Sequence, residues 1–177
     1  MLKKISLVGI FVFAFAAIGF AQATPHADAQ RAEMKKLDGL AGQWKGSGWI
    51  QQPDGKRETF TGTETVQRKI DGLALLVEGK FSNAEGKVIH ETLAVLAFDP
   101  RAKGYRFRTY LAGGMSGEHD FKLLAGGGGY EWGFQFPTGS VRYIIKTTND
   151  VWLETGEFSR DGKTWMKIFE MKLEKVK

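Results

Sequence analysis

Few residues of this chain are suited to chemistry. Cysteine is absent, and the histidines are His26, His90 and His119. His90 and His119 could together ligate a metal ion or a heme iron. Glu64, His119 and Tyr143 could instead act as the acid and base groups of an enzyme. The sequence contains no HExxH, GxSxG or P-loop motif, so either chemistry depends on the fold bringing these side chains together.

The elements that would position these residues are strands. From Gln43 onward, apolar and polar residues alternate, and turn-forming pairs such as Asp71-Gly72 and Asn149-Asp150 recur along the chain. This pattern predicts ten strands. They are expected at 43–51, 57–70, 73–82, 87–98, 105–112, 116–124, 130–136, 140–148, 151–160 and 163–175. So many hairpin-linked strands favour closure, because closing the sheet removes its exposed edges.

One helix is expected before the strands, within residues 27–40, where it would cover one end of the barrel as a lid or plug. Trp44, at the head of the first strand, is expected to fill that same region of the interior. The predicted fold class is therefore all-β, a single antiparallel up-and-down β-barrel of about ten strands with one short N-terminal helix.

Aromatic side chains dominate the rows that are expected to face inward. In the seventh strand, alternation puts Tyr130, Trp132, Phe134 and Phe136 on one face. A barrel of this size can enclose a small ligand. The wall of the expected cavity consists of Trp44, Phe107, Trp132, Phe134, Tyr143 and Trp165.

Some polar residues share the inward parity. Glu64 and Arg68 have it in the second strand, and His119 has it in the sixth. A buried charge is costly unless it is paired, so Glu64 and Arg68 predict an internal salt bridge, a water-filled cavity or a polar ligand head, unless a bulge reverses the parity. In the ligand-binding interpretation, Arg68 or His119 fixes the polar head. The sequence does not decide whether His90 points inward or outward, because both faces of the strand at 87–98 are apolar.

The first 23 residues have the composition of a secretory signal peptide. Two lysines precede an apolar run over residues 5–20, and Ala21-Gln22-Ala23 fits a cleavage site. A retained membrane anchor is the alternative, but this run is shorter than the roughly 20 residues that span a bilayer. The predicted organisation is a signal peptide at 1–23 and one barrel domain at 24–177.

Composition also limits the expected partners. Cleavage would lower the formal net charge from +5 to +3, and the remaining basic residues are spread among acidic ones. No nucleic-acid partner is therefore expected. A secreted chain without cysteine has no disulfides, which favours the bacterial periplasm as its location. We expect a monomer or homodimer with no cofactor and no stable membrane insertion after cleavage.

Two parts of the chain resemble known families. Leu37, Leu40 and the G-x-W-x-G-x-G motif of Gly42 to Gly48 resemble the opening of calycin-type barrels, which include lipocalin, nitrobindin-like and fatty-acid-binding-like proteins. Residues 154–165, with Phe169-Glu170-Met171, are similar to the bacterial domain-of-unknown-function family DUF1579 of the same class. The resemblance implies a ten-stranded barrel with an internal cavity.

The resemblance also bears on function. Nitrobindins bind heme through a histidine on a late strand, whereas no histidine follows His119 in this sequence. The sequence therefore favours a non-catalytic, secreted barrel that binds a small hydrophobic or amphipathic ligand in its interior. One alternative is a calycin-type enzyme that uses Glu64, His119 and Tyr143. Another is a heme- or metal-binding barrel that uses His90 or His119, and a packed barrel without a cavity is the simplest interpretation.

Overall fold

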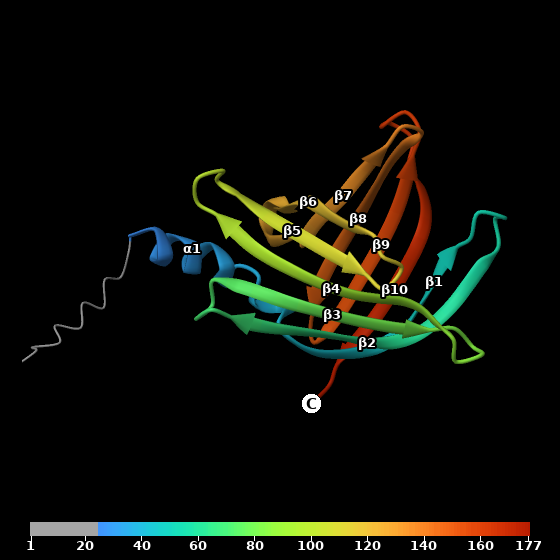
Figure 1. Cartoon of the computed structure of the whole chain (residues 1–177), viewed down its shortest axis with the longest axis horizontal. Helices are drawn as coiled ribbons and strands as arrows, with labels where there is room; N and C mark the ends of the chain where they lie inside the picture. Colours follow the sequence, from blue (N-terminus) through green and yellow to red (C-terminus); the bar gives the residue numbers. More distant parts are fainter. Residues whose placement is uncertain (1–24) are drawn as a thin grey trace, which may run out of the picture.

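The structure is a computed structural model that describes residues 25–177, and its main feature is a closed antiparallel barrel. Each strand pairs with its neighbours along the chain, and the last strand pairs with the first (Figure 1). The strands are β1 (Gly42–Gln51), β2 (Arg57–Lys69), β3 (Ala74–Ser82), β4 (Val88–Asp99), β5 (Gly104–Leu111), β6 (Ser116–Leu123), β7 (Tyr130–Phe136), β8 (Gly139–Thr148), β9 (Val151–Ser159) and β10 (Met166–Lys175). The predicted all-β barrel is confirmed. The predicted signal peptide lies outside the described residues.

Local turn chemistry explains why successive strands form hairpins. Asn149 and Asp150 alone join β8 to β9, and their φ values are 51° and 61°. A two-residue turn with positive φ at both positions matches the twist of the flanking strands, and Asn and Asp tolerate this conformation better than most residues. The register of the β8–β9 pair is thus set by the local sequence of the turn.

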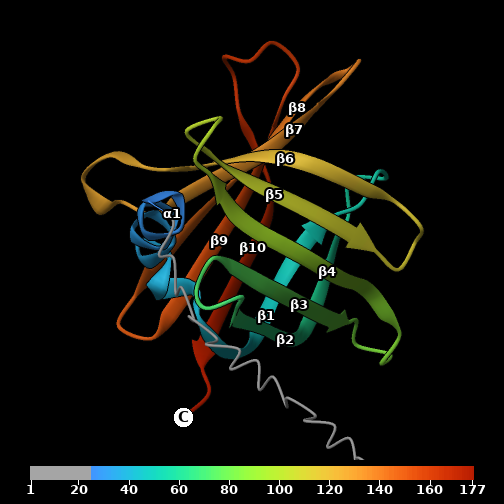
Figure 2. The ribbon, with the colours of Figure 1, turned by 60° about the vertical axis from the view of Figure 1, so that its left-hand side comes forward.

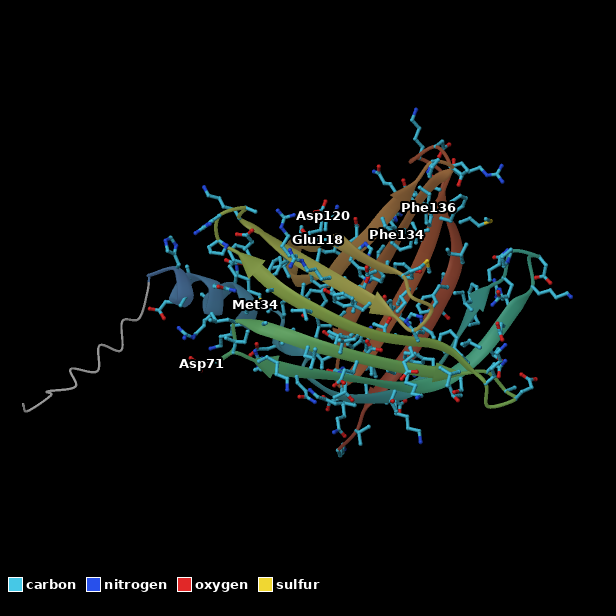
Figure 3. All side chains as sticks on the ribbon, in the orientation of Figure 1. Met34, Asp71, Glu118, Asp120, Phe134 and Phe136 are labelled. Carbon is cyan, nitrogen blue, oxygen red and sulfur yellow. The ribbon has the colours of Figure 1, made fainter. Side chains whose placement is uncertain are left out.

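Three short helices complete the described chain: α1 (Pro25–Lys35), η1 (Asp38–Leu40) and η2 (Ala125–Gly127). Figure 2 shows α1 lying across one end of the barrel. The Tyr105 hydroxyl donates a hydrogen bond of 3.1 Å to the carbonyl oxygen of Glu33. Arg31 forms an ion pair of 2.8 Å with Asp71 in the β2–β3 turn, and Figure 3 shows Met34 and Asp71 together at this end. None of the helices within residues 25–177 combines the length and the hydrophobicity needed to cross a membrane.

Trp44 fills the interior next to this lid. It is 1% exposed, and its indole N–H donates a hydrogen bond of 2.9 Å to the carbonyl oxygen of Leu40. Its ring meets Trp152 edge-on, with 5.6 Å between the ring centroids. Two residues along β1, a Cβ on Gly46 would lie 2.1 Å from the carbonyl oxygen of Lys172. The opening motif therefore combines a large core side chain with a close approach of the β10 backbone.

The inner face of the barrel is packed near the lid and half-open at the other end. Near α1, Leu75, Leu96 and Leu173 point inward and are each at most 1% exposed. Away from α1, Phe136 at the end of β7 is 45% exposed (Figure 3). Other inward residues away from the lid also keep part of their surface exposed: Ile50, His90, Phe134, Tyr143 and Phe169. The interior thus presents accessible aromatic surface at the end opposite the lid.

Candidate functional site

Two glutamates face the interior of the barrel. Glu64 comes from β2 and Glu154 from β9, and they are 9% and 7% exposed. In the β2–β3 register, Glu64 lies opposite Gly79, where a Cβ would be 2.5 Å from the Glu64 carboxylate oxygen Oε2. The missing side chain at Gly79 therefore makes room for the Glu64 carboxylate, which has the inward position that alternation predicts.

The Glu154 carboxylate is held by two tryptophans. The indole N–H of Trp132, on β7, donates to Oε1 at 3.1 Å, and the indole N–H of Trp152, on β9, donates to Oε2 at 3.2 Å. Each carboxylate oxygen thus has one fixed donor. This arrangement orients the carboxylate and partly replaces its lost hydration.

Burial changes the protonation of both acids. Loss of hydration, and then repulsion from Glu154, raise the pKa of Glu64 to about 8. Loss of hydration also raises the pKa of Glu154 to about 7, although the two indole N–H groups oppose that shift. Within residues 25–177, neither carboxylate joins a salt bridge, and no side-chain hydrogen bond reaches Glu64. Near neutral pH the two acids therefore share protons rather than both being ionised.

Aromatic rings form a wall beside the acids. Trp132 and Tyr143 stack with 4.3 Å between their centroids and an interplanar angle of 11°. Phe107 meets Trp132 edge-on at 5.2 Å, and Phe134 lies 6.4 Å from Tyr143. Burial, followed by the charge of Glu154, raises the pKa of Tyr143 to about 12, so its hydroxyl stays protonated at neutral pH. Trp132, Phe134 and Tyr143 are each partly exposed, so this wall gives the interior an aromatic surface that is not completely covered.

The two histidines of the barrel are held apart. In the β5–β6 register, His119 lies opposite Phe107, and in the β4–β5 register, Phe107 lies opposite Leu96. His119 is therefore level with Leu96, two strands away. His90 lies six residues from Leu96 along β4, which is roughly 20 Å of strand. His90 shares the inward parity of Thr92, because the β3–β4 register pairs it with inward Phe81. Among the described residues, no group of three or more His, Cys, Asp and Glu side chains is arranged to hold a metal ion.

His119 has local partners of its own. Its Nε2 lies 2.9 Å from the hydroxyl of Thr109, and its ring is 5.5 Å from both Trp132 and Phe134. Burial lowers the pKa of His119, and the same cause lowers the pKa of His90. No hydrogen bond in the described part of the chain joins Glu64, His119 and Tyr143, so the expected acid–base set is not connected in this structure.

Two of the predicted site residues lie elsewhere. Arg68 forms an ion pair with Asp38 of η1 at the lid end, so the Glu64–Arg68 salt bridge, one of the alternatives that the sequence left open, does not form within the described residues. Trp165 precedes β10, and its ring lies 4.0 Å from the Arg142 guanidinium. Arg142 belongs to the outer row of β8, and a bulge between Lys167 and Phe169 shifts the register of β10. Trp165 is therefore outside the barrel wall.

The sequence interpretation missed two interior residues, Trp152 and Glu154. They share one face of β9, and the β9–β10 register places them opposite Leu173 and Met171. The signal was present, because Trp152, Glu154 and Gly156 alternate with Val151, Leu153 and Thr155. Both rows contain an apolar residue, so alternation did not decide which row faces inward.

A groove lies on the outer face of the barrel. This groove of about 530 Å³ runs over β2 to β5, and its lining includes Thr65, Glu78, Leu93 and Tyr110. These four residues form one row across the paired strands, next to the inward row that contains Glu64 and Gly79. The outer groove is therefore separated from the carboxylates by the thickness of the sheet.

Comparison with known proteins bears on the fold. The sequence matches no protein-family model, and it matches no curated protein. The solved structure of Rv2717c from M. tuberculosis is similar with a TM-score of 0.64 at 14% identity, over 81% of this chain and 97% of that one. The S-type phycobiliprotein lyase CPES from Guillardia theta is similar with a TM-score of 0.58 at 9% identity, over 82% of this chain and 93% of that one. These likenesses show a shared barrel fold, while membership of the calycin class and of DUF1579 stays a prediction.

Proposed function

We propose that this protein is a secreted, periplasmic barrel that binds a small amphipathic ligand in its half-open interior without transforming it. The observation that carries the proposal is the partial exposure of rings that point inward. Trp132, Phe134 and Tyr143 form part of the inner wall, yet each keeps some accessible surface. Exposed aromatic surface inside a barrel with polar groups below it is typical of a ligand pocket.

Binding fits the site better than catalysis does. One protein with this fold is named a lyase, so the fold alone does not decide between the two roles. Among the described residues, Glu64, His119 and Tyr143 have no hydrogen bonds to one another, so no preformed acid–base relay joins them. The aromatic wall needs no such connection to hold a ligand.

A neutral aromatic alcohol tests this proposal. We expect 1-naphthalenemethanol to change the tryptophan fluorescence and to raise the melting temperature as its concentration rises. Phe134→Ala should weaken binding about two- to ten-fold, because it removes one ring contact. Tyr110→Ala is the matched control, since Tyr110 is 51% exposed and lies in the outer groove. Equal losses in both variants, or no binding by naphthalene compounds with neutral, cationic and anionic heads, would contradict the proposal.

A further inference from the structure

The buried acids have no cation inside the described barrel to balance them. Among the described Lys and Arg residues, the strand registers put Arg68 and Lys175 on inward rows, and both lie at the lid end. Arg68 pairs with Asp38, and the Lys175 ammonium lies 5.2 Å from the centroid of the Trp44 ring. Neither of these two side chains forms a salt bridge with Glu64 or Glu154. When one or both acids are ionised, no cationic side chain of the described barrel offsets their charge.

Glu64 is the less satisfied of the two acids. Glu154 accepts both indole N–H groups, whereas no side-chain donor in the described chain reaches Glu64. At 9% exposure, Glu64 is a nine-tenths buried carboxyl group that points into the interior. Gly79 leaves the space that its carboxylate occupies. An unpaired carboxylate in such a place destabilises the folded protein, so a fold that retains one gains if a bound molecule supplies the missing donor or charge.

The surroundings of the acids favour a cation for a second reason. The stacked Trp132 and Tyr143 rings lie beside Glu154. Trp132 donates a hydrogen bond to the Glu154 carboxylate, and the charge of Glu154 contributes to the raised pKa of Tyr143. The faces of such rings attract cations. The two barrel histidines do not oppose this preference, because burial lowers the pKa of His90 and of His119 and so favours their uncharged forms.

We infer that the ligand carries a cationic nitrogen head, such as a protonated amine, on a flat apolar body. The head binds Glu64 and Glu154, and the body lies against Trp132, Phe134 and Tyr143. This inference rests on the proposed function, because it names the class of ligand for the same site. An anionic head would meet two acids, and a neutral head would gain hydrogen bonds without the charge attraction.

Three probes that share one ring system test the inference. They are 1-naphthylmethylamine, 1-naphthalenemethanol and 1-naphthoic acid, titrated calorimetrically into the purified protein at pH 8. We expect the amine to bind about ten-fold tighter than the alcohol, or more, because charge-assisted hydrogen bonds replace neutral ones. We expect the acid to bind most weakly. Glu64→Gln should reduce the affinity for the amine about ten-fold and that for the alcohol less than about three-fold.

The controls separate this inference from the proposed function. Glu78→Gln is the matched variant, because Glu78 is exposed, lies next to Gly79 and faces outward; it should leave all three affinities unchanged. If Glu64→Gln fails to fold, Glu154→Gln provides an independent variant. The preference of the wild-type protein for the amine over the alcohol and the acid also tests the inference without any variant. If the alcohol or the acid binds as tightly as the amine, or if Glu64→Gln binds the amine as tightly as the wild type does, the cationic-ligand inference is overturned. The proposed ligand-binding function would still stand in that case. If no probe binds, the proposed function fails as well.

Discussion

Glu64→Gln should raise the free energy of unfolding at pH 9 by about 2–4 kcal/mol, while it changes stability little at pH 4. The pKa of Glu64 is raised from 4.5 to about 8 in the folded barrel. Below pH 4.5 the group is protonated in both the folded and the unfolded chain. Between pH 4.5 and 8 the unfolded chain loses its proton first, so the stability of the wild type falls as pH rises. The amide that replaces the carboxyl group in the variant stays uncharged throughout and avoids this loss.

Urea unfolding at pH 4, 7 and 9 measures this effect directly. The wild-type and variant curves should lie close together at pH 4 and separate as pH rises. Glu78→Gln removes an exposed carboxylate one residue from Gly79 on the outer face of β3, and it should follow the wild-type profile. If Glu64→Gln and wild type lose stability in parallel between pH 4 and 9, burial does not raise the pKa of Glu64 and the prediction is contradicted.

Trp44→Ala should lower the free energy of unfolding by about 3–5 kcal/mol, the range for removing a buried tryptophan or phenylalanine from a core. Trp44 is 1% exposed, packs edge-on against Trp152 and donates its indole N–H to Leu40. The substitution leaves a cavity between η1 and β9 and an unpaired carbonyl group. Thermal and urea unfolding of the variant should both show the loss.

Trp49→Ala is the control on the same strand. Trp49 has the opposite parity to Trp44, and its ring lies 3.7 Å from the Arg57 guanidinium. The control substitution removes a partly exposed cation–π pair, which is worth about 0.5–1 kcal/mol. Comparable losses in Trp44→Ala and Trp49→Ala would contradict the assignment of the inner and outer faces of β1.

Strand positions and closure could be predicted because they depend on local signals. Each hairpin is set by a short turn such as Asn149-Asp150, and alternation marks the strands on both sides. The inward placement of Glu64 and His119 followed from the same alternation along regular strands. These features need no information from residues far away in the sequence.

The paired side chains of the site were harder to predict. The ion pair between Arg68 and Asp38 joins the end of β2 to η1, and strand parity says nothing about a helix that covers the barrel end. Trp165 was misplaced because the bulge between Lys167 and Phe169 breaks the alternation on which its assignment depended. The partnership of Glu154 with Trp132 joins β9 to β7 through the interior, which a one-dimensional pattern does not reveal.

The location of the bound molecule tests the central claim most directly. Intermolecular nuclear Overhauser effects between 1-naphthylmethylamine and the isotopically labelled protein report which side chains lie next to the probe. We expect contacts with Trp132, Phe134 and Tyr143, on the inner wall at the half-open end. Contacts with Leu93 and Tyr110 in the outer groove instead would place binding on the outer surface and would contradict a ligand site inside the barrel.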